Sequence, residues 1–188
     1  MPHRHPKRPP IPTQWLMTDE RMGEDLWHAI AMLPPGAGIV FRHHATARPE
    51  RRALFAQVTR AARRRRLVLV RAGPERLGRE AGIHGRGRPV RDGIRTWAAH
   101  SRTEAIAGKR LGADALFVSP VFSTRSHPGA AALGVRRAVA VARGLGIPVI
   151  ALGGMDSARF RRLQRLGFHG WAAIDAWLPD QKRKAVPT

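Results

Sequence analysis

The chain has 188 residues, a length typical of one domain, and 43% of them are hydrophobic, enough for a buried core. It contains no cysteine, which excludes a disulfide scaffold and a thiolate metal site and fits a reducing compartment, so we expect a cytoplasmic protein. The formal net charge of +21 permits non-specific contact with nucleic acid or attraction of anionic substrates.

The two ends of the chain differ in composition from the middle. Residues 1–13 are rich in Pro, His, Arg and Lys and are predicted to be a disordered basic tail. No apolar segment follows them, so we expect no signal peptide, and no apolar run approaches the roughly 20 residues that span a membrane. Residues 180–188 are predicted to be a polar C-terminal tail, and residues 14–179 to form one domain.

Short apolar runs alternate with helical patterns throughout this domain. Eight runs are predicted as strands, at residues 15–18, 38–42, 67–70, 82–84, 94–99, 113–118, 148–152 and 170–174. Helices are predicted at residues 25–33, 49–66, 102–111, 135–145 and 158–166, with one or two helical turns at residues 74–80 and the start of a last helix at residue 175.

Eight parallel strands close into a barrel, so the predicted fold class is α/β, a single short (β/α)8 TIM barrel. The chain is short for this fold, and the helices must be trimmed, most of all around residues 73–93. An open doubly wound sheet is the alternative. It usually has fewer strands and a Gly-rich first turn, which residues 19–23 do not provide.

Polar residues at the ends of the later strands are candidates for a phosphate site. Gly153 and Gly154 separate a strand from a helix, and glycines there let backbone N–H groups approach a phosphate. A tight turn without a ligand is the alternative. The loop 123–127 adds hydroxyls and cations, including Thr124, Ser126 and His127, although a solvated polar loop explains it equally well.

Histidines end several of the predicted strands. His43 and His44 follow Arg42 at the second, His84 ends the fourth and His100 follows the fifth, so these imidazoles are predicted to converge on one rim. His100 is the candidate general acid/base, with helix capping as the alternative. No metal is predicted, because no carboxylate joins these histidines and their spacing is not a ligand signature.

Seven segments resemble, in chain order, the thiamine phosphate synthase and thiazole tautomerase superfamily. They are Trp15–Asp19, Ile39–His44, Ala81–Gly85, Ala99–Asp114, Ser119–His127, Pro148–Met155 and Gly170–Ile174. The resemblance implies the barrel fold and an enzyme of thiamine biosynthesis acting on a small phosphorylated heterocycle. It implies a phosphate pocket made by Thr124, Ser126, Gly153, Gly154 and the backbone at Ala173 and Ile174. The substrate would also contact Arg42, His44, His84 and His127.

The chain departs from this family at the positions that hold Mg2+ in the synthases. Those enzymes carry an Asp after the third strand and another after the His of the fourth, whereas this chain has Arg71-Ala72 and Gly85–Arg88. No cofactor is therefore expected. Mg2+ would be required only if the protein is a synthase. The family's serine on the eighth strand is Asp175 here, which would repel a phosphate unless a cation lies between them.

Three functions follow from the resemblance and its departures. The tautomerase branch needs no metal and uses a histidine where His100 stands, so we favour metal-free proton transfer on a thiazole phosphate, ahead of condensation. The alternative is condensation of pyrimidine pyrophosphate with thiazole phosphate, with Arg71, Arg86 or Arg88 replacing Mg2+. The third is a non-catalytic barrel that binds a phosphorylated ligand or nucleic acid.

The arginines are spread over every predicted helix, which favours a solvated surface. No membrane partner is expected, and nothing in the sequence indicates an oligomeric state.

Overall fold

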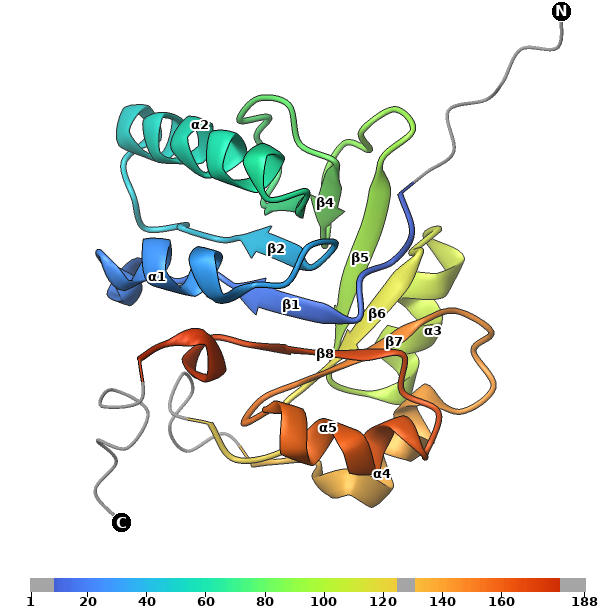
Figure 1. Ribbon diagram of the computed structural model, residues 1–188. Coiled ribbons are helices and arrows are strands. Elements are labelled where there is room, and N and C mark those ends of the chain that lie inside the picture. The colour runs from blue at the N-terminus through green and yellow to red at the C-terminus, as the bar shows by residue number, and fades with distance from the viewer. Residues whose placement is uncertain (1–8, 125–130, 180–188) are drawn as a thin grey trace, which may run out of the picture.

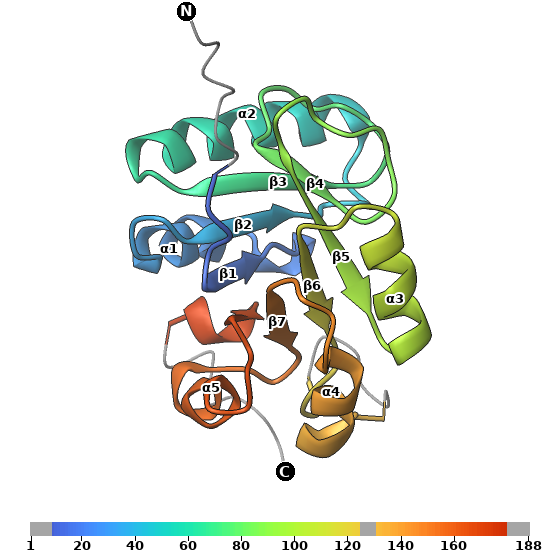
Figure 2. The same cartoon turned by 90° about the vertical axis from the view of Figure 1, so that its right-hand side faces the viewer.

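The computed structural model describes residues 9–124 and 131–179, which form a closed barrel of parallel strands in chain order, β1 to β8, with β8 paired back to β1 (Figures 1 and 2). The strands are β1 (Gln14–Met17), β2 (Gly38–Phe41), β3 (Val68–Ala72), β4 (Gly82–His84), β5 (Ile94–Ala99), β6 (Ala115–Val118), β7 (Val149–Leu152) and β8 (Gly170–Ala173). The predicted fold class is confirmed, and all eight predicted strands are present.

Helices cover most of the outside of the barrel. They are α1 (Asp25–Met32), α2 (Arg48–Arg64), α3 (Arg102–Arg110), α4 (Gly134–Ala142) and α5 (Ser157–Gln164). Two short 3-10 helices, Glu20–Met22 and Asp175–Trp177, follow β1 and β8. None of the helices in the described part of the chain is long and apolar enough to cross a bilayer.

The helix predicted at residues 74–80 is wrong, because this segment is an irregular loop. The carboxylate of Glu80 accepts the backbone N–H of Gly78 (3.1 Å) and an N–H of Arg71 (2.5 Å). These hydrogen bonds from the Glu80 side chain to the local backbone and to Arg71 compete with the backbone hydrogen bonds of a helix. The segment still covers the barrel, since Leu77 is buried in the outer core.

The core has two layers, one inside the barrel and one between the strands and the helices. The inner layer consists of Trp15, Met17, Val40, Val70, Ala72, Ile94, Phe117, Ile150 and Ala172. Trp15 and Phe117 meet edge to face with ring centroids 5.2 Å apart. Since side chains alternate along each strand, the residues between these positions face the helices.

Gly38 makes room for the largest side chain inside the barrel. It pairs with Trp15 of β1, and a Cβ atom at this position would lie 2.1 Å from Cε3 of Trp15. We therefore expect Gly38→Ala to lower the free energy of unfolding by about 1–3 kcal/mol through overpacking, as measured by urea denaturation. Gly78→Ala is the matched control, because a Cβ there would lie 3.4 Å from Phe55, an ordinary contact. Equal effects of the two substitutions would contradict this explanation.

Part of the predicted N-terminal tail is bound to the barrel. Carbonyls of three consecutive residues accept hydrogen bonds: Pro12 from the indole of Trp15 (2.7 Å), Thr13 from the backbone N–H of Trp171 (2.8 Å), and Ile11 from Nε2 of His169 (2.8 Å). The boundary predicted at residue 13 is therefore wrong for residues 11–13. Residues 1–8 and 180–188, which carry most of both predicted tails, lie outside the described residues.

Candidate active site at the carboxyl ends of the strands

His100 directly follows β5, and hydrogen bonds hold both its backbone and its ring. Its backbone N–H donates to the carboxylate of Glu104 (2.7 Å), while the hydroxyl of Ser101 caps α3 by accepting the N–H of Glu104 (3.2 Å). Its Nδ1 lies 2.8 Å from the carbonyl oxygen of Ser119. A carbonyl only accepts, so Nδ1 carries a proton and neutral His100 has an unprotonated Nε2. Among the described residues, Nε2 has no hydrogen-bond partner.

The turn after β7 packs closely against the turn after β6. Gly153 and Gly154 have φ angles of 95° and 58°, in the left-handed region that favours glycine. A Cβ on Gly153 would lie 2.8 Å from Cα of Pro120, and one on Gly154 would lie 2.5 Å from the carbonyl oxygen of Ser123. Arg159 donates to the carbonyl of Gly154. Any other residue at these two positions would therefore separate the two turns.

The structure brings together most of the predicted phosphate-site residues that it describes. Ser119-Pro120 contacts His100 on one side and Gly153 on the other. Thr124 follows Ser123 and so lies beside the glycine turn. Ala173 ends the neighbouring β8, and the side chain of Ile174 packs against the inner layer of the core. Ser126 and His127, the other predicted members, lie outside the described residues.

Arg42 at the end of β2 is held by the end of β1. Its Nε donates to the carbonyl of Thr18 (2.8 Å) and one terminal nitrogen to the carboxylate of Asp19 (2.9 Å), while its backbone N–H donates to the Thr18 hydroxyl (3.0 Å). That hydroxyl also contacts Nδ1 of His43 (3.0 Å). A hydrogen bond from Arg21 to Asp19 keeps the pKa of that carboxyl low, at about 2. The clamp leaves one terminal nitrogen of Arg42 without a partner among the described residues.

His84 enters the barrel from β4. Its Nδ1 lies 2.8 Å from the hydroxyl of Thr96, and its ring meets Phe117 edge to face with centroids 5.1 Å apart. Burial lowers the pKa of His84 to about 4, and the positive charges of Arg42 and His44 act in the same direction. His84 is therefore neutral at pH 7 and serves as a hydrogen-bonding group.

The low pKa of His84 predicts a pH dependence of stability. Between its folded pKa of about 4 and the ordinary value of 6.5, the unfolded chain binds more protons, so stability rises with pH across this range. The contribution is complete above pH 6.5 and is lost as the pH falls towards 4. Urea denaturation at several pH values should show the difference in stability between the wild type and His84→Gln growing over this window. A difference that does not change with pH would contradict the assignment.

The other predicted rim residues occupy different positions. His44 is exposed beside Gly73, and burial followed by the charge of Arg51 lowers its pKa. His43 does not reach the mouth, since its ring stacks on Phe41 of the outer core with centroids 4.6 Å apart. The prediction that these imidazoles converge therefore fails for His43, whose ring is held by Phe41 and by the Thr18 hydroxyl.

Asp175 has a cation nearby. The pKa of Arg21 is raised, first by its hydrogen bond to Asp19 and also by the charge of Asp175. The negative charge at the end of β8 is therefore partly balanced on the side of β1.

Thr18 and Ser119, which hold Arg42 and His100, were not predicted from the sequence. Their only local signal is that each directly follows a strand.

The residues above β3 and β4 do not fit Mg2+. The ends of these strands carry Ala72, Gly73 and residues 85–88, none of which is acidic, and in the described part of the chain no three His, Asp or Glu side chains come together. Mg2+ requires oxygen ligands, usually including one or two carboxylates. Arg71 does not replace the ion, because it faces away from the barrel interior and is fully buried in an ion pair with Glu80 (2.5 Å). The proposal that Arg71 substitutes for the metal is therefore wrong.

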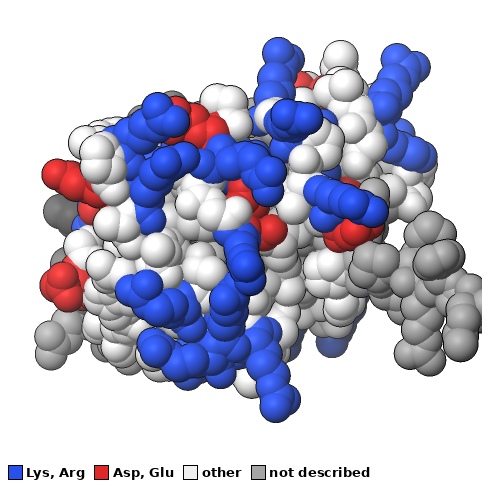
Figure 3. Space-filling model, turned by 90° about the horizontal axis from the view of Figure 1, so that it is seen from above, with Lys and Arg blue, Asp and Glu red and all other residues white. Residues whose placement is uncertain are grey.

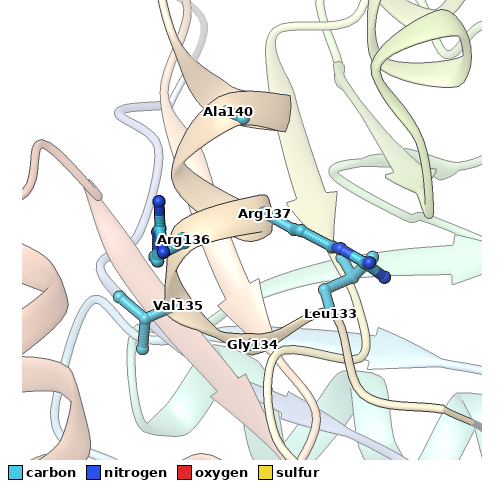
Figure 4. A pocket seen from close by; sticks show the side chains of 6 residues that line it. All are labelled: Leu133, Gly134, Val135, Arg136, Arg137 and Ala140. Atoms are coloured by element: carbon cyan, nitrogen blue, oxygen red, sulfur yellow. The ribbon is translucent and has the colours of Figure 1, made fainter.

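An open pocket lies over the first turns of α4 (Figure 4). It is lined by Leu133, Gly134, Val135, Arg136, Arg137 and Ala140. Backbone N–H groups of Leu133 and Gly134 donate to the carbonyls of Pro120 (2.8 Å) and Val121 (3.1 Å), so the start of α4 is fixed to the turn after β6. Arg136 and Arg137 lie on opposite sides of the helix. None of the predicted site residues lines this pocket.

Residues 90–177 match the family model described as thiamine monophosphate synthase, which confirms the resemblance over this part of the chain. Thiamine-phosphate synthase of Desulfitobacterium hafniense is 35% identical over 91 residues, 48% of this chain and 44% of that protein. The enzyme of the same name from Chloroflexus aurantiacus is 38% identical over 80 residues, 42% and 37% of the two chains. The aligned part of the chain thus spans less than half the length of these relatives.

Solved structures extend the similarity of fold to the whole barrel. A thiamine phosphate pyrophosphorylase from Pyrococcus furiosus has a TM-score of 0.73 at 20% identity, covering 92% of this chain and 91% of that one. The corresponding protein from Bacteroides thetaiotaomicron has a TM-score of 0.55 at 19% identity, with coverages of 88% and 84%. At these identities the likeness establishes the fold alone.

Proposed function

We propose that this chain, a member of the thiamine phosphate synthase and thiazole tautomerase superfamily over residues 90–177, acts on a thiazole phosphate at the mouth of its barrel. The reaction is an isomerisation in which the ring becomes aromatic by moving one proton. No metal takes part. The observation that carries the proposal is the 2.8 Å contact between Nδ1 of His100 and the Ser119 carbonyl, from which we infer that Nε2 is left as a base.

The proton transfer is balanced within the substrate. Nε2 of His100 removes a proton from a ring carbon, the electron pair moves through the ring, and the imidazolium returns the proton to another atom of the same molecule. The Ser119 carbonyl stabilises the imidazolium, because Nδ1–H keeps its acceptor throughout. Neither His84 nor Arg42 has to change charge during this cycle.

The phosphate of the substrate is assigned to the turn after β7. Gly153 and Gly154 pack against residues 120–123, next to the Ser119 carbonyl that contacts His100. Thr124 and the end of β8 at Ala173 and Ile174 would complete the phosphate site. The loops after the seventh and eighth strands are the usual phosphate site of such barrels. A phosphate there would place its ring over the mouth, towards His100 and Arg42.

The proposal is tested by incubating the protein with the non-aromatic thiazole phosphate and following its conversion by proton NMR. Conversion faster than in buffer, with incorporation of solvent deuterium at the new C–H position, is the expected result. Binding of the substrate without any acceleration would reject the enzymatic part of the proposal. It would instead leave a barrel that only binds a phosphorylated ligand.

The alternative function is condensation of pyrimidine pyrophosphate with thiazole phosphate, and it is favoured by the names of the curated relatives. It requires charge neutralisation of the pyrophosphate. With Arg71 engaged by Glu80, this role falls to Arg42 at the mouth and to exposed Arg86 and Arg88 in the loop after β4. Formation of thiamine phosphate from the two substrates, assayed by its fluorescent oxidation product, distinguishes condensation from isomerisation.

A further inference from the structure

Half of the excess positive charge lies on one quarter of the chain. Residues 48–95 contain fifteen arginines against four acidic residues, a net charge of +11 out of +21 for the whole protein. This segment comprises α2, β3, β4 and the two loops that replace helices after these strands. The arginines are therefore less evenly distributed than the sequence pattern suggested.

Only some of these arginines are committed to the fold. Arg51 donates to the carbonyls of Arg42 and Ala72, Arg65 to those of Ala31 and Leu33 at the end of α1, and Arg71 pairs with Glu80. The remaining exposed side chains are Arg48, Arg52, Arg60, Arg63, Arg64, Arg66, Arg76, Arg79, Arg86, Arg88 and Arg91. Within the described residues, only Arg48 and Arg91 of this set form an ion pair, with Glu75 and Asp92.

The exposed arginines of α2 and of the first loop lie on a common face. Arg52 donates to the carbonyl of Arg76 (3.4 Å), and Arg48 lies 3.5 Å from Glu75, so the loop runs alongside the helix. Arg60, Arg63 and Arg64 follow Arg52 at helical spacing, over about 18 Å of the axis at 1.5 Å per residue. Figure 3 views the molecule from the side of α2 and shows more Lys and Arg side chains than acidic ones on this face, with several acidic side chains among them.

We propose that the outer face of α2 and the adjoining loops binds the phosphate backbone of a nucleic acid. Uncompensated arginines spaced along a surface neutralise several phosphates at once and release their counterions. The single Phe, Tyr or Trp of residues 48–95 is Phe55, which is buried, so the face offers no ring on which a base could stack. Binding is therefore directed to the backbone of a duplex and carries little sequence preference.

An anionic membrane is the less suitable partner for this face. Amphipathic helices that bind a bilayer surface carry large apolar side chains on one face and basic side chains on the other. The exposed large hydrophobic residues of the described chain are Met32, Leu111 and Leu166, all outside residues 48–95. The proposal is independent of the reaction at the barrel mouth, because none of the exposed arginines of α2 belongs to that site.

The test is fluorescence anisotropy of a labelled 20-base-pair DNA duplex of arbitrary sequence, titrated with full-length protein over a range of salt concentrations. The variant R60Q/R63Q/R64Q removes three charges from the α2 face. The matched control R161Q/R162Q/R165Q removes three exposed charges from α5 and the residue after it, on another side of the barrel. Circular dichroism melting checks that both variants are folded, and R76Q/R79Q provides a second variant of the same face outside any helix.

The α2 variant should bind the duplex at least about 10-fold more weakly than the wild type at low salt. Its slope of log K against log salt should be smaller by about 2–3, since each lost phosphate contact removes about 0.9. The control should stay within about 2-fold of the wild type, and R76Q/R79Q should weaken binding in the same direction as the α2 variant. Equal weakening by the α2 variant and the control would overturn the proposal, because only net charge would then matter. Tighter binding to phosphatidylserine vesicles than to the duplex would also overturn it.

Discussion

Replacing Glu80 by Gln is expected to lower the free energy of unfolding by about 3–5 kcal/mol, the largest stability effect that we predict. Glu80 and Arg71 form an ion pair whose side chains are both fully inaccessible to solvent. The substitution leaves the buried Arg71 guanidinium with uncharged acceptors only, the carbonyls of Gly73 and Arg88 and the oxygen of the new side-chain amide. Urea denaturation followed by circular dichroism measures the change.

Two further variants show whether the loss comes from the unpaired charge. Glu75→Gln removes the partner of Arg48 in an exposed pair and should cost less than about 1 kcal/mol. The double variant Arg71→Met/Glu80→Leu removes both charges and should recover much of the stability lost in Glu80→Gln. A Glu80→Gln protein as stable as the wild type would show that this pair does not hold the 73–93 loop against the barrel.

Replacing His100 by Ala is expected to reduce kcat for the proposed isomerisation by about 10²–10⁴-fold, the contribution typical of a general acid/base. KM should change little, since the phosphate turn and the Arg42 clamp remain intact. The stability of the fold should be nearly unchanged, because His100 is exposed.

His28→Ala is the matched control for this experiment. His28 is also exposed, but it lies on α1 and outside the barrel mouth, so its removal should leave kcat and KM unaltered. Retention of the full rate by His100→Ala would assign the proton transfer to another group. Loss of the rate in both variants would point to a general effect of removing a histidine.

The barrel itself was predictable from the sequence because its signals are local. Short apolar runs bounded by Gly, Pro and polar residues recur with helical patterns between them. Eight such runs are the number of strands that a closed (β/α)8 barrel requires. The start of α5 carries a local signal of the same kind, because a short polar residue, Asp156 or Ser157, precedes the helix; it is Asp156 whose carboxylate accepts the N–H of Arg159 (2.8 Å).

The errors arose where distant contacts override the local pattern. The segment 74–80 has helical spacing, but Glu80 bonds Gly78 and Arg71 instead. Arg71 stands where a metal-binding residue was expected by resemblance, yet alternation along β3 turns it away from the mouth. The clamp that holds Arg42 joins residues 23 and 24 positions apart, which no local pattern reveals.

The barrel mouth is proposed to act on a phosphorylated heterocycle without a divalent ion. The direct measurement is the rate of thiazole phosphate conversion in excess EDTA, compared with the rate after addition of Mg2+. We expect equal rates, because the mouth offers arginine and histidine but no group of carboxylates above β3 and β4 in the described chain. Conversion that stops in EDTA and returns with Mg2+ would contradict the account.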